Sequence, residues 1–304
     1  MGILLKTLAT IAFTAMAVGV RFAAPRIPLG EIVVFRSFIA LPLLCLWLAL
    51  TGGFPRELAT RRPWGHIGRG LSGSVGMFAN FSALALLPLA DATAYFYASP
   101  IFVTLIAAFG LREYVHASRW LAVLIGFGGV LAMVADHMSL GGPAPVHPNE
   151  ALGAAVALTG AVFAAVSIIQ TRRLTQSEHT GAIVFYFSLL TTLAGAVLVA
   201  AAYVLPSVFS AQAWVAPNAT EWEALVGAGL AGGLAQILVT QSYRYADASL
   251  LAAYDYLAMV WALAASVVIF GQWPSTNVLV GAGAIAFSGL LAIFGEKFIL
   301  RRHH

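Results

Sequence analysis

The sequence predicts an all-α integral membrane protein with ten transmembrane helices, arranged as two inverted five-helix repeats around a central cavity. Three observations predict it: the composition, the spacing of the apolar runs and an internal repeat. Of the 304 residues, 61% are hydrophobic and only 9% are charged, with a mean hydropathy of +0.89. Soluble domains carry about 25% charged residues, so lipid must be the main solvent. Long runs rich in Leu and Ala, without two-residue alternation, favour helices over a barrel.

Apolar runs of the length that crosses a bilayer, about 20 residues each, follow one another along the chain. We place spans at residues 3–20, 30–51, 65–87, 92–111, 118–136, 150–170, 180–205, 222–244, 248–271 and 276–297. Turn sequences such as Thr51-Gly52-Gly53 and Pro217-Asn218 separate them. The first run resembles a signal peptide, but the similar runs that follow predict a first span instead.

Lysine and arginine are unevenly distributed among the predicted loops. With the N-terminus in the cytoplasm, the inner loops and their flanks hold Lys6, Arg56, Arg61, Arg62, Arg69, Arg112, Arg119, Arg172, Arg173, Arg244, Lys297, Arg301 and Arg302. The outer side holds Arg21 and Arg26, while the outer links 137–149, 206–221 and 272–275 hold neither residue type. Because cytoplasmic loops carry an excess of these residues, we expect a multi-pass protein of the cytoplasmic (inner) membrane with both termini in the cytoplasm. This distribution explains the net charge of +4 without a nucleic-acid partner.

The second half of the chain repeats the first. G-F-G-G-V-L-A-M-V-A-D (126–136) aligns with A-F-S-G-L-L-A-I-F-G-E (286–296), A-D-A-T (90–93) with A-D-A-S (246–249), and I-V-V-F-R-S (32–37) with A-I-V-F-Y-F (182–187). Between them, Gly73, Gly76 and Asn80 align with Gly229, Gly232 and Gln236 at one constant offset. The predicted repeats are residues 1–137 and 150–304, joined by a linker at 138–149. Since each has an odd number of spans, the second enters the membrane inverted, as in alternating-access transporters.

Two segments resemble a known family. L-P-L-A-D-A-T-A-Y-F-Y-A-S-P-I-F followed by G-L-R-E, and Y-L-A-M-V-W-A-L-A-A-S followed by F-G-Q, are similar to the drug/metabolite transporter superfamily and, within it, to the ten-helix EamA-type exporters. The resemblance implies a secondary transporter that exports small metabolites, amino acids and aromatic ones among them. The family commonly ends its fourth span with Gly-Glu. In the first copy of this chain Glu113 does not directly follow Gly110, and in the second copy Gln272 replaces the glutamate. We therefore expect Glu113 to be an interfacial charge.

Asp255 lies within an otherwise apolar stretch, L-L-A-A-Y-D-Y-L-A-M-V-W-A (250–262). It is eight residues into the predicted ninth span, about 12 Å deep at a rise of 1.5 Å per residue, which is close to the middle of a core of roughly 30 Å. A charge there costs at least about 2.5–3.5 kcal/mol and marks a functional site by default. Asp255 would bind a substrate ammonium group or carry a coupling proton; the alternative is a structural pair with a buried arginine.

The repeat adds further polar candidates. The constant offset pairs Asp255 with Ser99, which precedes Pro100, and it pairs Asn80 with Gln236. We expect these positions to line one central cavity near the membrane midplane. The alternative for the two amides is hydrogen bonding between packed helices.

Arg36 and two tyrosines complete the candidate set. Arg36 lies about six residues into the second span, where it either extends to the membrane surface or offers a bidentate fork to a substrate carboxylate. Tyr95 shares a helix face with Ser99, and Tyr254 precedes Asp255. Buried tyrosines need a hydroxyl partner, so we expect some to line the pocket, although packing and interface belts are commoner roles.

Several functional classes are excluded by absent motifs. The sequence contains no H-E-x-x-H, G-x-S-x-G or P-loop pattern, so we expect neither an enzyme nor an ATP-driven pump, and no metal or cofactor. The expected partners are a small-molecule substrate, protons as a coupling ion, and the lipid bilayer. Within transport, the alternatives are an exporter of drug-like organic cations and an uptake permease. Outside transport, the alternative is a membrane scaffold or sensor.

Overall fold

A computed structural model describes residues 1–86, 95–134, 150–271, 276, 279–285, 287–288 and 291. Every regular element in these ranges is helical. The predicted linker at 138–149, the A-D-A-T segment at 90–93, Gln272 and much of the predicted tenth span lie outside the described residues.

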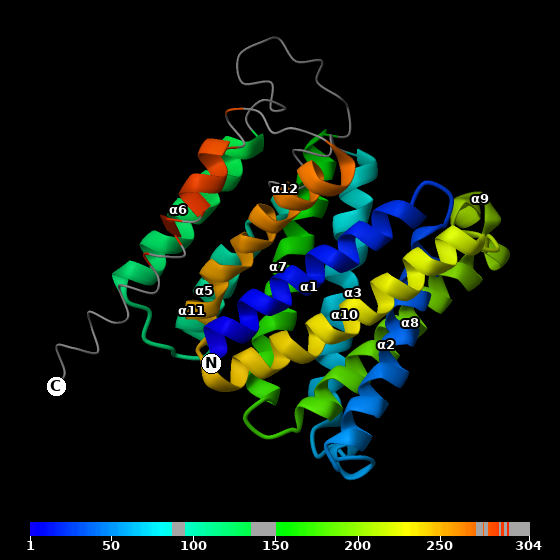
Figure 1. Cartoon of the computed structure of the whole chain (residues 1–304), viewed down its shortest axis with the longest axis horizontal. Coiled ribbons are helices and arrows are strands. Elements are labelled where there is room, and N and C mark those ends of the chain that lie inside the picture. Colours follow the sequence, from blue (N-terminus) through cyan, green and yellow to red (C-terminus); the bar gives the residue numbers. More distant parts are fainter. Residues whose placement is uncertain are drawn as a thin grey trace. The chain divides into compact units, whose positions relative to one another are not determined.

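The helices follow the predicted spans closely (Figure 1). They are α1 (Gly2–Ala23), α2 (Leu29–Leu50), α3 (Pro63–Leu86), α5 (Ser99–Gly110), α6 (Ala117–Val134), α7 (Glu150–Leu174), α8 (Thr180–Val204), α9 (Pro206–Phe209), α10 (Ala219–Tyr245), α11 (Ala248–Ala252) and α12 (Leu257–Phe270), with 3₁₀ turns η1 (Arg56–Leu58), η2 (Ser210–Gln212) and η3 (Ala253–Tyr256). By length and composition, six described segments can cross a membrane, and two shorter helices are also apolar. A helical, multi-pass membrane fold is therefore confirmed, while the count of ten and the inversion stay predictions.

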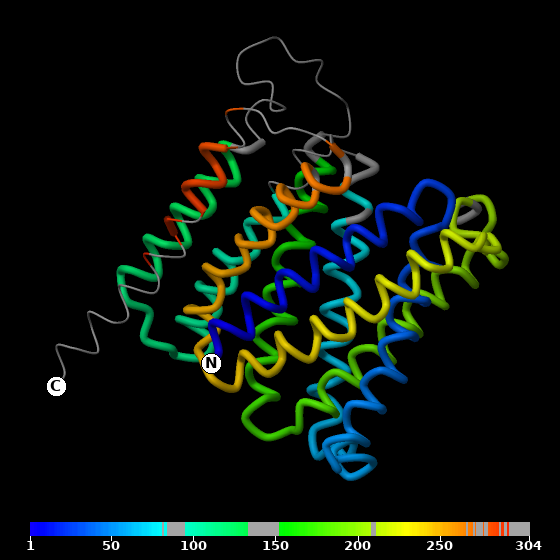
Figure 2. The backbone as a smooth tube through the Cα atoms, in the orientation of Figure 1, coloured from blue at the N-terminus to red at the C-terminus, as the bar shows by residue number. Residues whose placement is uncertain are grey.

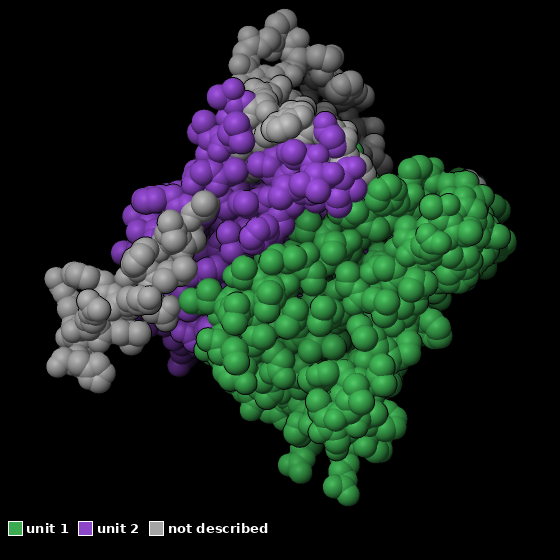
Figure 3. Space-filling model, in the orientation of Figure 1, with its two compact units in different colours: residues 1–74, 170–245 green, residues 75–169, 246–304 purple. Residues whose placement is uncertain are grey.

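The chain forms two compact units, shown in different colours in Figure 3. The first unit consists of residues 1–74 and 170–245, and the second of residues 75–169 and 246–304. The boundaries fall within α3 and α7. Each unit therefore draws on both halves of the sequence, and neither coincides with one predicted repeat.

Helix pairs of the first unit pack through glycines. In this unit α10 packs against α1 and α2, and α2 packs against α8, as the backbone trace in Figure 2 also shows. Gly30 of α2 faces Val199 of α8, whereas Gly181 of α8 faces Leu48 of α2, so the two helices are antiparallel. A Cβ atom added to Gly195 would lie only 2.8 Å from the carbonyl oxygen of Gly30. Small residues at such crossings let membrane helices approach closely.

We expect Gly195→Ala to destabilise the protein by about 1–3 kcal/mol, because the added methyl group meets backbone atoms that cannot rotate away. Gly227→Ala is the matched control, since nothing lies within 4 Å of the position its Cβ would occupy. Both changes improve helix propensity equally, so their difference isolates the close approach. Thermal unfolding in detergent measures it, and equal melting temperatures would show that α2 and α8 are not in close contact.

The second unit has its own core around an aromatic ring. Tyr256 is fully buried with Val130 and Ile285, and Tyr97 packs against the same cluster. Gly126 of α6 provides the space for the Tyr256 ring, because a Cβ at that position would overlap the ring carbons. The ring is therefore held in place by residues from α6 and from the helical segment at 279–285.

Candidate functional site

The seven predicted site residues are divided between the two units. Arg36 and Gln236 belong to the first unit, and Asn80, Tyr95, Ser99, Tyr254 and Asp255 belong to the second.

Arg36 lies on the protein-facing side of α2. It shares the stripe of buried residues formed by Ile32, Val33 and Ala40, whereas Phe38 on the other side is 59% exposed. Arg36 itself is half-buried, and its Cγ lies 3.7 Å from the position of a Cβ added to Gly232 of α10. It makes no hydrogen bond or ion pair with any other residue that the structure describes. This location favours a ligand-binding role over extension along the lipid face to the membrane surface.

Gln236 is held by a residue that sequence reasoning did not select. Its Oε1 accepts a hydrogen bond from Nη2 of Arg69 at 3.1 Å. Arg69 is only 3% exposed, and it also donates to Oγ1 of Thr171 at 2.5 Å and to the carbonyl oxygen of Ile183 at 2.8 Å. Its guanidinium group lies 4.0 Å from the ring centroid of Phe187. One buried cation thus joins α3 to α7, α8 and α10.

Arg69 was counted with the cytoplasmic charges because it follows Arg61 and Arg62 in the sequence. Arg61 and Arg62 precede α3, whereas Arg69 lies within it and is buried, which the count of charges by loop does not show. Its position two turns into the helix was the one available signal.

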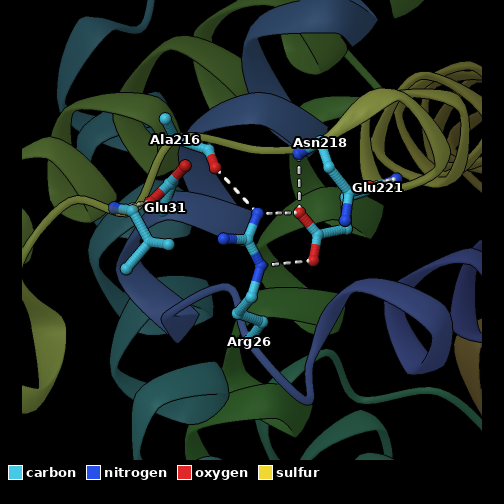
Figure 4. Close-up of polar contacts among 6 residues, drawn as sticks. Arg26, Glu31, Ala216, Asn218 and Glu221 are labelled. Atoms are coloured by element: carbon cyan, nitrogen blue, oxygen red, sulfur yellow. Dashed lines mark hydrogen bonds and ion pairs between the residues drawn. The ribbon is translucent and has the colours of Figure 1, made fainter.

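The start of α10 is fixed by a reciprocal capping box with an added arginine (Figure 4). The backbone N–H of Asn218 donates to Oε2 of Glu221 at 2.7 Å, and the N–H of Glu221 donates back to Oδ1 of Asn218 at 2.9 Å. Arg26, between α1 and α2, donates to both oxygens of Glu221 and to the Ala216 carbonyl oxygen. The Glu221 bond, with a smaller contribution from Glu31, raises the pKa of Arg26. These contacts fasten one end of the first unit.

Glu178 fastens the opposite end, where α8 begins. Its Oε1 accepts from the backbone N–H of Arg61 at 3.0 Å, and its Oε2 lies 3.6 Å from Nε2 of His66. Arg244 donates to the Glu178 carbonyl oxygen and to Oγ1 of Thr180. Both ends of the first unit are therefore closed by structural contacts of charged side chains, whereas Arg36 lies between these ends, within α2.

In the second unit, Asn80 and Tyr95 lie where α3 meets α7. A Cβ added to Gly160 would lie 3.1 Å from the backbone nitrogen of Asn80, so the helices cross closely at this point. Tyr95 packs against a small cluster formed by Ala83 and Ala157. The Asn80 side chain is half-buried and makes no hydrogen bond to another described residue.

Both spans that carry the paired candidates Ser99 and Asp255 are interrupted. We expected continuous helices over 92–111 and 248–271, but a turn occupies residues 97–98, and η3 replaces α-helix at Ala253–Tyr256. The orange segment from α11 through η3 to α12 still runs on as one rod in Figure 2. The two interruptions occupy matching positions in the two repeats, because the offset that pairs Ser99 with Asp255 also pairs residues 97–98 with 253–254. A 3₁₀ stretch inside a helix often marks a functional hinge.

The side chains at these interruptions differ in exposure. Ser99 and Tyr254 are buried, while Asp255 is half-buried, with its Oδ2 atom shielded. The rings of Tyr97 and Tyr256 lie 6.5 Å apart at an angle of 35°. Sequence reasoning selected Tyr95 and Tyr254 from this group of tyrosines, but it is Tyr97 and Tyr256 whose rings lie together beside the interruption.

Glu113, which we expected to be an interfacial charge, also acts as a helix cap. Its two carboxylate oxygens accept from the backbone N–H groups of Ala248 and Ser249 at 3.3 and 3.2 Å, at the start of α11. Arg119 fixes the same turn by donating to Oγ of Ser249 at 2.9 Å and to Oδ2 of Asp247 at 3.3 Å. Two residues from the region around the start of α6 thus position the span that carries Asp255.

We expect Glu113→Ala to destabilise α11 by about 1–2 kcal/mol, because two N–H groups at its start lose their acceptor. Glu113→Gln retains one acceptor oxygen and is expected to cost less. Hydrogen exchange of residues 248–252 measures the effect, and unchanged protection in Glu113→Ala would contradict the capping role.

No group of three or more His, Cys, Asp or Glu side chains that could hold a metal ion occurs among the residues the structure describes.

Comparison with known proteins decides the family. The sequence profile of the EamA-like transporter family matches residues 1–135 and 151–294, nearly the whole chain. The chain belongs to the EamA-like transporter family, within the drug/metabolite transporter superfamily. The pseudopaline exporter CntI of Pseudomonas aeruginosa is 29% identical over 97% of this chain and 96% of that protein.

Other relatives show how varied the cargo is among similar transporters. The S-adenosylmethionine uptake transporter of Rickettsia conorii is 26% identical over 93% of this chain and 89% of its own length. The riboflavin transporter of Vibrio cholerae is 28% identical over 86% of this chain and 82% of its own length. A crystal structure with 22% sequence identity superposes with a TM-score of 0.81 over 96% of both chains, which supports the fold. As an EamA-like protein, the chain has small-molecule transporters as relatives and is not expected to be an enzyme.

Proposed function

We propose that this EamA-like protein is a secondary transporter of the cytoplasmic membrane that exports small metabolites, amino acids and aromatic ones among them, by alternating access. The observation that carries the substrate class is Arg36. Its guanidinium group is on the protein-facing side of an apolar helix, with no partner among the described residues. Charges inside a membrane are normally paired, so the missing counter-charge is best supplied by cargo.

A carboxylate is the group that complements Arg36. The planar guanidinium fork matches two carboxylate oxygens, and such bidentate pairs are stronger than neutral hydrogen bonds. Gly232 leaves room beside the Arg36 side chain, and Gln236 follows one helical turn later on the same face of α10. The first unit therefore has the groups that recognise and orient an anionic end.

The second unit contributes the opposite charge, Asp255. Asp255 complements the ammonium group that an amino acid carries in addition to its carboxylate. The aromatic residues near Asp255, including Tyr97 and Tyr256, suit a partly apolar cargo. A drug-like organic cation would need Asp255 but not Arg36, and this difference separates the two substrate classes.

Alternating access rests on the proposed inverted repeat, which the contacts of α2 and α8 support. Gly30 faces Val199 and Gly181 faces Leu48, and Val199 lies as far beyond Gly181 as Leu48 lies beyond Gly30. Such reciprocal contacts are expected of antiparallel helices related by a two-fold axis. These contacts pair Gly30 with Gly181, which is one residue away from the pairing given by the alignment of 32–37 with 182–187. The corresponding interruptions of the fourth and ninth spans agree with the same symmetry.

A flux screen in proteoliposomes tests the proposal. Purified protein is reconstituted, and uptake or efflux of labelled amino acids is measured with and without a pH gradient. Saturable flux of neutral and aromatic amino acids, absent from protein-free vesicles, is expected. Flux of organic cations alone would favour the drug-exporter alternative, and flux of no small molecule would favour a scaffold or sensor. Because relatives include both an exporter and an uptake transporter, the driving gradient must be imposed in both directions.

A further inference from the structure

The Tyr256 hydroxyl is the starting point for a more specific assignment. Its side chain is fully buried, and its Oη atom has no hydrogen-bond partner among the residues described. Buried tyrosine hydroxyls usually find a partner, and each exception needs an explanation such as a bound water, ion or ligand. Packing against Gly126, Val130 and Ile285 prevents the ring from turning toward solvent. A hydrogen-bond partner for the hydroxyl must therefore come to this buried position.

The Tyr256 side chain has an acidic residue and a second aromatic ring as neighbours. The Asp255 carboxylate is adjacent in the chain and interacts electrostatically with both Tyr97 and Tyr256. The Tyr97 ring lies 6.5 Å from the Tyr256 ring, and aromatic faces carry negative charge density. In η3 the carbonyl oxygens of Tyr254 and Asp255 both accept from the N–H of Leu257, so acceptor oxygens are grouped at this turn. These features together select a cation that can donate hydrogen bonds.

We infer that the interruption of the ninth span is an ammonium-binding subsite, in which Asp255 supplies the counter-charge, the Tyr256 hydroxyl accepts a hydrogen bond and Tyr97 presents its ring face. The inference rests on the proposed transport function and specifies how its substrate is recognised. An anion is excluded by repulsion from Asp255. Ammonium groups are well matched to a site that combines a carboxylate with aromatic faces.

Two probes that differ in charge test this subsite separately from the rest of the substrate. Phenethylamine carries only the ammonium group, and 3-phenylpropionate carries only the carboxylate, on similar aromatic frames. Binding of each to the full-length protein in nanodiscs is measured by calorimetry, alongside flux in proteoliposomes. Asp255→Asn is expected to weaken phenethylamine binding about thirtyfold or more and to leave 3-phenylpropionate unchanged.

The tyrosines give finer tests. Tyr256→Phe keeps the ring and removes the hydroxyl, and we expect about a fivefold loss for phenethylamine alone. Tyr97→Leu is expected to lower the affinity for phenethylamine about fivefold. Tyr97→Phe retains the ring face and should keep most of that affinity. Tyr245→Phe is the control, because Tyr245 is 61% exposed. Melting temperatures of all variants show whether the unit remains folded.

The outcomes are distinguishable from a failure of the proposed function. If the wild-type protein binds and moves neither probe nor any amino acid, the transport proposal fails. If it moves them but Asp255→Asn and Tyr256→Phe weaken both probes equally or neither, the ammonium subsite is wrong while transport stands. If phenethylamine binding is unaffected and sodium binding in a choline background is lost in Asp255→Asn, the site holds a coupling ion, and the inference is overturned.

Discussion

Arg36→Gln is expected to abolish transport of substrates that carry a carboxylate while leaving the protein folded. A charge-assisted bidentate contact that loses its cation costs about 2–5 kcal/mol, which lowers flux at limiting substrate by about 30-fold or more. Folding is expected to be maintained because Arg36 makes no hydrogen bond or ion pair with any other residue in the described part of the chain. Removing an unpaired charge from an apolar helix relieves a desolvation cost.

The measurement is flux of a labelled amino acid into proteoliposomes, together with binding of 3-phenylpropionate and phenethylamine. Arg36→Gln should lose binding of 3-phenylpropionate and keep binding of phenethylamine. The opposite result is expected for Asp255→Asn. Arg36→Lys retains the charge without the fork, and we expect an intermediate loss. Arg21→Gln is the control, since Arg21 is exposed at the end of α1. Wild-type carboxylate transport by Arg36→Gln would refute this role, and with it the reason for placing amino acids first.

Local sequence predicted the spans because their ends are locally encoded. The second span was expected at 30–51 and lies at Leu29–Leu50, and the seventh was expected at 180–205 and lies at Thr180–Val204. Apolar runs stop where turn-forming residues begin, so a boundary needs no knowledge of distant residues. The family was identified from a different signal, the internal repeat and two segments that resemble EamA-type exporters.

The interruption at Asp255 was not foreseen, because its cause is not local. Residues 250–257, L-L-A-A-Y-D-Y-L, contain no Gly or Pro that would end a helix. The Tyr256 ring instead fits against Gly126 of α6, more than a hundred residues earlier in the chain. By contrast, the interruption before Ser99 has a local signal in Pro100, which has no backbone N–H to donate and disfavours the helix before it.

Two charged residues have contacts that their place in the sequence does not show, for the same reason. Glu113 acts as a cap on a helix that begins far along the chain at Ala248, and sequence spacing cannot show which helix start a carboxylate will reach. Arg69 is buried by partners from three other helices. Charge counting sorts residues by loop, so it does not show the partners of a charge that lies just inside a helix.

Arg69→Met is expected to destabilise the first unit by about 2–4 kcal/mol. Its loss removes the donor to Oε1 of Gln236, to Oγ1 of Thr171 and to the Ile183 carbonyl oxygen, and a buried acceptor left unpaired costs about 1–3 kcal/mol. The variant no longer has to bury a guanidinium group, which is itself unfavourable. The net loss of stability is therefore smaller than the summed cost of the unpaired acceptors. Thermal unfolding in detergent measures it, and a variant as stable as wild type would show that the four-helix junction is not a stabilising element.

The double variant Arg69→Met with Gln236→Met separates helix packing from transport. Replacing both partners of a buried hydrogen bond by apolar groups can be nearly neutral, so we expect the pair to be more stable than the sum of the single changes predicts. If stability and flux both recover, the Arg69–Gln236 contact serves packing alone, and Gln236 leaves the set of substrate ligands. If stability recovers and flux does not, the amide acts on the substrate, and Arg69 is the positioning residue that fixes its orientation on the face of α10 that also meets Arg36.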